Sequence, residues 1–260
     1  MSTDPAPLTD TGTRLLQALE RTGPRPVLAW YGESARIELS GHVLANWVIK
    51  TIGHLHDEIA LEPGDAVFVD LAPHWKRLAL VLAARSLGAE VTVHERTGGA
   101  PADDPAAPGA DQEPSVVITD RPGSALAQSA DEVLALEAVS LAPRWPGALP
   151  PLVHDWLAEV RGSSDRLGIE LPDWSGPAPQ VPPVTPEVAA GPGEAVPDRA
   201  VPDRIVPRDD AGPPRLLVDG DGLSALPHVL GTLLAGGGIV CPAAAVTARA
   251  AQEEGVTARG

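Results

Sequence analysis

The chain has 260 residues and a formal net charge of −16, and 43% of its residues are hydrophobic but only 3% are aromatic. Such an acidic chain repels phosphate backbones and anionic lipid headgroups, so nucleic acid and membrane surfaces are not expected as partners. One cysteine (Cys241) excludes an internal disulfide, no apolar run approaches the roughly 20 residues that span a bilayer, and no secretory leader is recognisable, so we expect a cytoplasmic protein.

The first elements are a helix, a hairpin and a longer helix. The stretch "DTGTRLLQALERTG" predicts a short amphipathic helix that ends at Gly23. "PVLAWY" and "ARIEL", joined by the turn "GES", predict a β-hairpin. Ser40 is a favourable N-cap for a helix that runs to Ile59. Apolar or small residues recur at three- and four-residue spacing along one face of that helix: Val43, Leu44, Trp47, Val48, Thr51 and Leu55.

The next segment predicts a β–α–β unit. A turn at residues 63–65 ("PGD") precedes "AVFVDLA", whose nearly continuous apolar character is typical of a strand buried on both faces. "HWKRLALVLAARSLG" predicts a helix closed by Gly88, and "AEVTVHE" predicts the next strand. This order implies a parallel sheet with a right-handed crossover.

The middle of the chain is less regular. Residues 96–114 lack large apolar side chains and predict a loop, followed by a buried strand in "SVVITD". "DEVLALEAV" predicts a strand or mixed element, and "LVHDWLAEV" predicts a short helix. The fold class is therefore α/β, with a parallel or mixed sheet flanked by helices.

A proline-rich segment divides the chain. Twelve of the 43 residues at 172–214 are proline, and "AVPDRAVPDRIVPR" repeats a five-residue unit within it. Proline at this density blocks helices and sheet ladders, so the segment is expected to be a disordered insertion. We therefore divide one α/β domain into residues 1–171 and 215–260. The second part predicts a strand ("RLLVDG"), a helix ("GLSALPHVLGTLLAGG"), a strand ("IVCP") and a last helix ("AVTARAAQEEG").

The glycine run at residues 236–238 has the composition of a phosphate-binding loop but not the right position. A phosphate loop follows a strand and precedes a helix, so that the amides of the helix N-terminus face the anion. Here the run follows a helix and precedes a strand. A turn that caps the helix is the favoured interpretation.

Four other patterns predict structure rather than chemistry. His54 and His56 diverge by about 200° on a helix and cannot bind one metal, so we expect two surface or half-buried histidines. "DGDG" at residues 219–222 lacks the later ligands of a calcium loop and predicts a turn. Ser224 lacks the second glycine of a nucleophile elbow, and Cys241 has no nearby cation to activate it.

The order of these elements resembles the opening of adenylate-forming enzymes, the AMP-dependent synthetases and ligases. In that family a hairpin leads into an L-T/S-Y-x-E-L motif and a long helix. Leu39, Ser40 and Leu44 match this motif, but Gly41 and Val43 replace its tyrosine and glutamate. The chain also resembles a small actinobacterial family distantly related to these enzymes.

Three further motifs extend the resemblance. Residues 63–65 match the family's "PGDRV" motif, and residues 87–89 loosely match its "LKAGA" motif. "ALPHVLGTLLAGGGIVCP" is similar to the family's "LPLFHVFG…LLAGATVV", which places His228 on the family's histidine. The resemblance implies a truncated form of the large domain of an adenylate-forming enzyme.

The departures from the family favour a loss of catalysis. The family's Ser/Thr/Gly-rich phosphate loop ends in "TGxPK", whereas the nearest segment here, "VDGDG", offers carboxylates that would repel a triphosphate. The later "YGxTE" motif, the ribose-binding aspartate and the domain with the catalytic lysine are not recognised either. We therefore expect no catalytic residue, metal or cofactor, and only weak cofactor-binding candidates: His228, Asp219 and Asp221.

Two functional hypotheses follow. The favoured one is a catalytically degenerate protein that serves as a non-catalytic binding or regulatory module, since fold alone does not carry activity. The alternative is a nucleotide- or acyl-binding enzyme with a divergent site at the carboxyl edge of the sheet. The expected partner is accordingly either another protein or a small nucleotide or acyl ligand.

Overall fold

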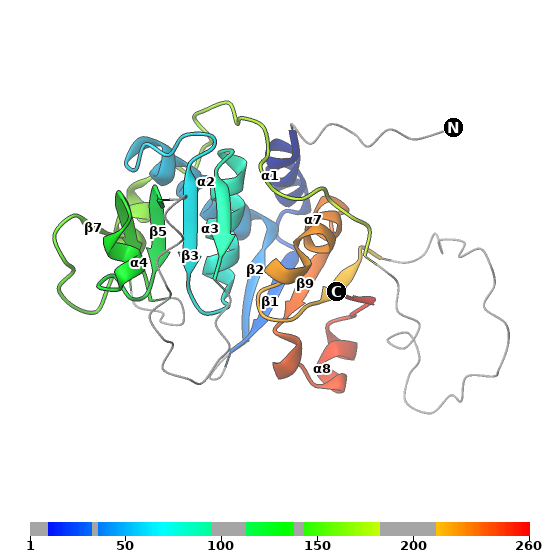
Figure 1. The fold of residues 1–260 in the computed structure, drawn as a ribbon. Helices are drawn as coiled ribbons and strands as arrows, with labels where there is room; N and C mark the ends of the chain where they lie inside the picture. The colour runs from blue at the N-terminus through cyan, green and yellow to red at the C-terminus, as the bar shows by residue number, and fades with distance from the viewer. Residues whose placement is uncertain (1–9, 33–35, 95–112, 138–142, 183–211) are drawn as a thin grey trace, which may run out of the picture.

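The computed structural model describes five stretches of the chain: residues 10–32, 36–94, 113–137, 143–182 and 212–260. Most of the loop predicted at 96–114 and the central part of the proline-rich segment lie outside the described residues. The described elements form two five-stranded sheets with helices between and outside them (Figure 1). The predicted α/β class, with parallel and mixed sheets, is confirmed.

The first sheet joins strands from both ends of the chain. Its order is β10-β8-β9-β1-β2, with bounds Ala258–Arg259 (β10), Arg215–Leu217 (β8), Gly238–Cys241 (β9), Pro26–Tyr31 (β1) and Arg36–Ser40 (β2). β1 and β2 pair antiparallel, which confirms the predicted hairpin, and the other pairs are parallel. The N-terminal hairpin therefore needs strands that follow the proline-rich segment to complete its sheet.

The second sheet is entirely parallel. Its order is β4-β3-β5-β6-β7, with bounds Glu90–Val93 (β4), Ala66–Asp70 (β3), Val116–Thr119 (β5), Glu132–Ala135 (β6) and Val153–Asp155 (β7). The helix α3 (Trp75–Ser86) connects β3 to β4, which confirms the predicted β–α–β unit.

Side-chain alternation in the strands defines the layers. The inward residues of both sheets share one core with the helices α1 (Thr11–Thr22), α2 (Gly41–Asp57), α3 and α7 (Leu226–Leu234). In the first sheet, Leu28, Leu216 and Ile239 face this core, whereas Ala29, Leu217 and Val240 join a smaller cluster on the opposite face, beside α8 (Ala248–Glu253). Val117 and Val133 of the second sheet likewise pack with α4 (Ala125–Gln128). The main core thus lies in a helical layer between the two sheets.

The helix ends follow the predicted capping residues. Ser40 caps α2, its hydroxyl accepting a hydrogen bond from the Val43 amide at 3.3 Å. Gly23 and Gly88 have φ angles of 65° and 78°, in the region that favours glycine. The buried face of α2 is as predicted except at Val43, which is 43% exposed because it lies on the first turn, at the edge of that face.

The segment "LVHDWLAEV" differs from its prediction. Only its second half is helical, as α5 (Trp156–Glu159) followed by a 3₁₀ turn at Val160–Gly162. Residues 153–155 instead form β7, because they complete parallel pairing along the edge of β6. A strand of three residues is too short to show the alternation of polar and apolar side chains that identifies a strand. The sequence pattern therefore favoured a single helix.

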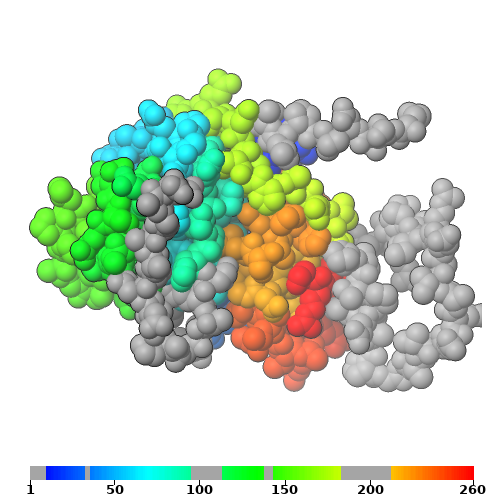
Figure 2. Space-filling view, viewed as in Figure 1, coloured from blue at the N-terminus to red at the C-terminus, as the bar shows by residue number. Residues whose placement is uncertain are grey.

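The start of the proline-rich segment is structured, contrary to prediction. Trp174 is only 5% exposed and joins the main core. The amide of Ser175 donates to the carbonyl of Arg85 at 3.3 Å, and the amide of Gln180 donates to that of Pro227 at 2.8 Å. Residues up to 182 therefore run across the surface from the α3–β4 turn to α7, as the yellow-green atoms show in Figure 2. Residues 183–211 lie outside the described part, and their predicted disorder stays a prediction.

Candidate functional site

The turn between β8 and α7 carries the three weak candidates from the sequence. Gly220 and Gly222 adopt φ angles of 52° and 86°, and the Gly222 amide donates to the Asp219 carbonyl at 2.9 Å. The predicted turn at residues 219–222 is therefore confirmed. It follows the carboxyl end of a parallel strand, the edge of an α/β sheet where ligands bind in many proteins.

Asp221 is engaged inside the protein. Its two carboxylate oxygens accept from Nε and Nη2 of Arg77 at 2.6 and 2.9 Å, and each side chain is 1% exposed. The His74 amide donates to the same carboxylate at 3.2 Å, and Arg77 Nη1 donates to the Leu71 carbonyl at 3.1 Å. Asp221 thus neutralises a buried guanidinium and is not available to a ligand from solvent.

Asp219 and His228 do not join that pair. Asp219 is exposed, and its side chain makes no hydrogen bond within the described residues. His228 is half-buried in α7, and its carbonyl accepts from the Thr232 hydroxyl at 2.8 Å. No hydrogen bond of its ring is formed within the described residues. On the same helix Leu230 and Leu233 are buried, whereas Leu234 is half-buried.

A second group of polar side chains lies between α2 and the β7–α5 segment, and the sequence did not suggest it. Trp47 of α2 contacts the buried Trp156 of α5, with ring centroids 5.6 Å apart. His54 lies seven residues after Trp47 on the same face of α2, and Glu159 lies three residues after Trp156. The aromatic contact therefore sets the position of α5 at which Glu159 meets His54.

The strand β7 supplies the third member of this group. His154 pairs with Leu134 of β6, and Leu134 belongs to the main core, so the His154 side chain is directed to the helical layer. Asp155 then caps α5, accepting from the Ala158 amide at 3.2 Å. With this cap the helix begins two residues after His154, and Glu159 comes back over the strand.

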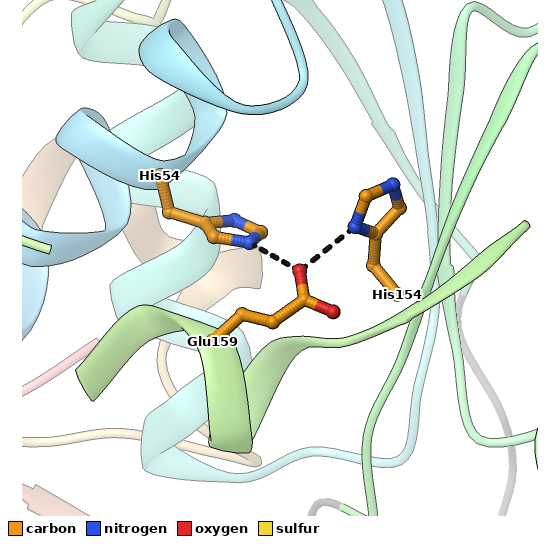
Figure 3. A group of neighbouring side chains, drawn as sticks. All are labelled: His54, His154 and Glu159. Atoms are coloured by element: carbon orange, nitrogen blue, oxygen red, sulfur yellow. Dashed lines mark hydrogen bonds and ion pairs between the residues drawn. The ribbon is translucent and has the colours of Figure 1, made fainter. Parts of the chain in front are cut away.

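The three side chains converge on one oxygen (Figure 3). Nε2 of His54 and Nδ1 of His154 lie 3.0 and 2.8 Å from Oε2 of Glu159. The other ring nitrogen of His154, Nε2, lies 3.3 Å from Oε2 of Glu132. Burial raises the pKa of Glu159, but the hydrogen bonds from both histidines lower it more, so its pKa lies below the usual value and the group is a carboxylate at neutral pH.

A pocket of about 590 Å³ borders this group. His154 and Glu159 both line it, together with the acidic residues Asp57 and Glu58. Lys50 donates to the carbonyls of Arg161 and Ser163, and Ser163 lines the same pocket. The group therefore combines two imidazoles and a carboxylate at the edge of a hollow that solvent can enter.

The side chains of His54 and His56 point in different directions on α2, as predicted, but only His56 has the expected environment. His56 is exposed beside Asp57, at 2.7 Å. His54 is fully buried, contrary to the expectation of a surface or half-buried residue, because it lies on the face of α2 that packs into the core. Its partners lie about 100 residues later in the chain, and no local spacing rule connects them.

Two other residues singled out in the sequence lie where their patterns suggested. Cys241 is fully buried in β9, and burial, together with the charge of Asp221, raises the pKa of its thiol far above the usual value. Ser224 is exposed on a short 3₁₀ turn, Leu223–Ala225. Neither geometry activates a nucleophile.

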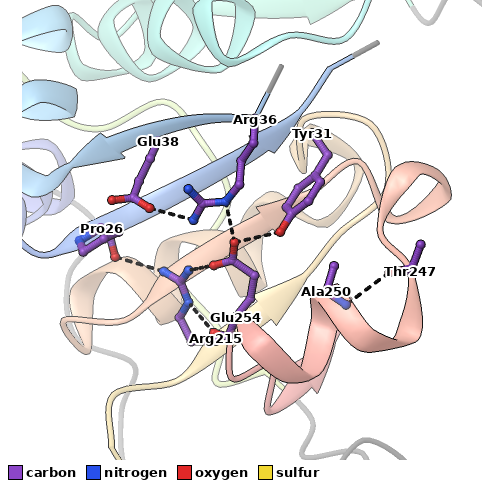
Figure 4. Close-up of polar contacts among 8 residues, drawn as sticks. All are labelled: Pro26, Tyr31, Arg36, Glu38, Arg215, Thr247, Ala250 and Glu254. Carbon is purple, nitrogen blue, oxygen red and sulfur yellow. Dashed lines mark hydrogen bonds and ion pairs between the residues drawn. The ribbon is translucent and has the colours of Figure 1, made fainter. Parts of the chain in front are cut away.

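A further charged cluster fastens the first sheet (Figure 4). The carboxylate of Glu254 accepts from Arg36, Arg215 and Tyr31 at 2.7, 2.7 and 2.9 Å. Arg215 also donates to the Pro26 carbonyl at 2.9 Å. The cluster ties the end of α8 to β1, β2 and β8, and every group in it has a partner, which is typical of a structural network.

Comparisons with known proteins agree with this architecture. No protein-family model matches the chain. A protein of Mycobacterium tuberculosis described as a TIGR03089 family protein is 33% identical over 91 residues, which are 34% of this chain and 37% of that protein. The organism is an actinobacterium, as the sequence resemblance implied.

Solved structures match over most of the chain. An acyl-CoA synthetase of Brucella canis has a TM-score of 0.60 at 20% identity, covering 95% of this chain and 46% of that one. Acetoacetyl-CoA synthetase from Streptomyces lividans has a TM-score of 0.57 at 16% identity, covering 88% and 38%. The N-terminal subdomain of NpsA from Klebsiella oxytoca, in complex with 3-hydroxybenzoyl-AMSN, has a TM-score of 0.54 at 12% identity, covering 100% and 61%.

The chain therefore has the fold of part of an acyl-CoA synthetase or adenylation domain, and the resemblance predicted from the sequence is confirmed. It spans less than half the length of the two synthetases. Within the described residues, no helix is both long and apolar enough to cross a bilayer.

Proposed function

We propose that this chain is a catalytically degenerate relative of adenylate-forming enzymes that acts as a non-catalytic binding or regulatory module. The observation that carries the proposal is the buried Arg77–Asp221 pair. Arg77 lies at the start of α3, which follows β3, and Asp221 lies in the turn that follows β8. The pair therefore joins two segments that come after the carboxyl ends of one strand from each sheet. A nucleotide site of this fold would need unpaired donors at such an edge.

The chemistry of the β8–α7 turn supports the same conclusion. Adenylation requires hydrogen-bond donors and positive charge on the triphosphate, because negative charge develops there during the reaction. The Arg77 guanidinium is paired with Asp221 of this turn, and Asp219 exposes a carboxylate there. A carboxylate facing a triphosphate opposes its binding unless a cation lies between them.

The alternative is a nucleotide- or acyl-binding protein with a divergent site, active or not. The NpsA subdomain shows that a protein of this fold can be solved with 3-hydroxybenzoyl-AMSN bound. The half-buried His228 at the start of α7 is the residue that this alternative would use, beside an acyl group. The partner is accordingly a protein or a small nucleotide or acyl ligand rather than nucleic acid or a membrane surface, given the acidic composition.

Two measurements test the proposal on the full chain. The first is pyrophosphate exchange with ATP and a panel of carboxylic acids, for which we expect no turnover above a blank. The second is a thermal-shift titration with ATP, AMP and acyl-CoA, in which binding by the folded state alone raises the melting temperature.

The results separate the two functions. Exchange that co-purifies with the chain and is lost in His228→Ala would overturn the proposal and establish the enzyme. A melting-temperature rise with AMP or acyl-CoA but no exchange would identify the ligand of a non-catalytic module. No response to any of the three ligands would leave a protein as the partner of the module.

A further inference from the structure

We propose that His54, His154 and Glu159 form a binding site for one divalent transition-metal ion, of which zinc is the type. The inference is independent of the function proposed above, because the site lies beside β7 at the edge of the second sheet, whereas that proposal concerns the β8–α7 turn. It rests on the ligand types, their spacing, the hydrogen bonding of His154 and the adjoining pocket.

The ligand atoms are of the right kind and close to the right spacing. Nε2 of His54, Nδ1 of His154 and Oε2 of Glu159 all lie within 4.8 Å of one another, and two of the separations are 3.0 and 2.8 Å. Zinc binds imidazole nitrogen and carboxylate oxygen at about 2.0–2.2 Å, so tetrahedral ligand atoms stand about 3.4 Å apart. Small rotations of the partly exposed His154 and Glu159 side chains, at 28% and 38% exposure, reach that spacing around a fixed His54.

The hydrogen bonds of His154 favour a cation in the centre. Both of its ring nitrogens face carboxylates, Nδ1 toward Glu159 and Nε2 toward Glu132. A neutral imidazole carries one proton and can donate to only one of them. With a metal ion on Nδ1, the proton stays on Nε2 and donates to Glu132, which is the carboxylate–histidine–metal arrangement found around many metal sites.

The burial of His54 points the same way. The side chain is 0% exposed, and its Nδ1 has no hydrogen-bond partner among the described residues. Its polar contact is therefore directed through Nε2 into this cluster. A buried imidazole with an unpaired nitrogen lowers stability relative to an apolar side chain of similar size, so the fold alone does not explain a histidine at this position.

The pocket supplies an open coordination position and a favourable field. Two of the three protein ligands, His154 and Glu159, line a hollow of about 590 Å³, which leaves room for water as a fourth ligand, as in open zinc sites. Asp57 and Glu58 line the same hollow and attract cations. Two imidazoles select against Mg²⁺ and Ca²⁺, which prefer oxygen ligands throughout.

The test is a titration of the full chain, stripped with a chelator, with ZnCl₂ by calorimetry and in competition with a chromophoric chelator. We expect saturable binding of one equivalent and a rise in melting temperature, with MgCl₂ giving neither. Tetrahedral Co²⁺ bound in place of zinc should give visible absorption bands. His154→Ala and Glu159→Gln should weaken zinc binding by at least tenfold, and Glu132→Gln by about tenfold through His154.

The matched control is His56→Ala, which removes an exposed histidine of the same helix and should leave zinc binding unchanged. His54→Leu should abolish binding while keeping the melting temperature of the metal-free chain, since it removes the unpaired buried nitrogen. If that variant does not fold, the variants of the two partly exposed ligands, His154→Ala and Glu159→Gln, still test the site. Absence of saturable zinc binding, equal binding of Mg²⁺, or binding that survives both His154→Ala and Glu159→Gln would overturn the proposal and leave a structural ion-pair cluster.

Discussion

Arg77 and Asp221 form a two-pronged ion pair, at 2.6 and 2.9 Å, in which both side chains are 1% exposed. The two residues follow strands of different sheets: Arg77 lies in the first turn of α3, after β3, and Asp221 lies in the turn after β8. Parallel N–H···O bonds fix the relative orientation of the two loops as well as their distance. The pair is therefore both a link between the layers and the reason why neither the Arg77 guanidinium nor the Asp221 carboxylate is available to a ligand.

Removing one charge of this pair should be costly. Asp221→Asn leaves the Arg77 guanidinium buried without a counter-charge, for which we expect a loss of about 3–5 kcal/mol in the free energy of unfolding. Urea denaturation followed by circular dichroism measures it. Replacing both residues by apolar ones, as in R77M/D221L, should recover part of the loss because no isolated charge remains.

The exposed pair Arg249–Glu253 is the control for this prediction. Its side chains are 87% and 62% exposed, so Glu253→Gln should have a much smaller effect than Asp221→Asn. Equal effects of the two substitutions would show that the Arg77–Asp221 pair does not hold the loops together.

The pH dependence of stability should contain a contribution from His74. Burial, and secondarily the charge of Lys76, lowers the pKa of this ring to about 3, while in the unfolded chain the pKa stays near its ordinary value of 6.5. The unfolded state therefore binds more protons as pH falls below about 6.5, and stability drops by up to about 1.4 kcal/mol per pH unit toward the folded pKa. Above that window the contribution is fully present.

The variant His74→Asn isolates this contribution. His74 caps α3, its Nδ1 accepting from the Lys76 amide at 3.3 Å, and asparagine can replace the cap without a titrating ring. Urea midpoints between about pH 5 and 7 separate the ring from the carboxylates, whose stabilisation is lost at lower pH. A wild-type slope that persists unchanged in the variant would contradict the assignment.

Local patterns in the sequence were sufficient for most elements. Ser40, Gly23 and Gly88 cap helices as expected, and the two strands around α3 pair in parallel. These features depend on backbone conformation and on periodicity within a few residues, which a single sequence displays. The β7 strand was missed because three residues on a sheet edge acquire their conformation from the neighbouring strand.

The polar contacts between distant segments could not be predicted. Arg77 meets Asp221 and His54 meets Glu159 across more than 100 residues, and which pairs meet depends on how the two sheets and their helices pack. The sequence did place Asp221 in a turn and among the weak binding candidates. Its role as the partner of a buried arginine follows only from the packing of α3 against that turn.

Trp174 and the later segment 183–211 should contribute very differently to the free energy of unfolding. Trp174 is 5% exposed and packs in the main core, so Trp174→Ala should lower the free energy of unfolding by about 3–5 kcal/mol. Halving the segment 183–211, whose composition predicts a flexible insertion, should change it by only about 0.6 kcal/mol. Thermal and urea denaturation compare the two. A cooperative loss of structure on shortening the segment would refute the predicted insertion.

The network around Glu254 should lose its contribution to stability at low pH. Burial raises the pKa of Glu254, but its bonds with Arg36, Tyr31 and Arg215 lower it more, so its folded pKa lies below the usual 4.5. Its stabilisation is therefore present above about pH 4.5 and is lost as pH falls through the folded pKa. Glu254→Gln should cost about 1.5–3 kcal/mol at pH 7, the range for hydrogen bonds to a charged group.

The neighbouring Glu253→Gln is the matched control, because Glu253 is exposed and contacts only the exposed Arg249 among the described residues. The difference between the two variants should shrink as pH approaches 4. If Glu254→Gln were as harmless as the control at pH 7, the cluster would not fasten α8 to the sheet.

Gly236 and Gly237 should resist substitution for two different physical reasons. The positive φ of the run, 73°, belongs to Gly236 and not to Gly237, so Gly236→Ala should cost about 1 kcal/mol through backbone strain. A Cβ on Gly237 would instead collide with the carbonyl oxygen of Pro214 and lie 3.0 Å from Thr232 Cγ2. Gly237→Ala should therefore be the more destabilising, because the obstacle is backbone of the neighbouring strand segment.

Gly123→Ala is the control. A Cβ at this position would have no other atom within 4 Å, and the φ of Gly123 is not positive. The expected order of unfolding free energies is Gly123→Ala above Gly236→Ala above Gly237→Ala, measured in urea. The glycine run is a turn between α7 and β9, so any nucleotide response of the folded chain should be the same in all three variants. A Gly237→Ala variant with wild-type stability but no nucleotide binding would make the run a ligand loop instead.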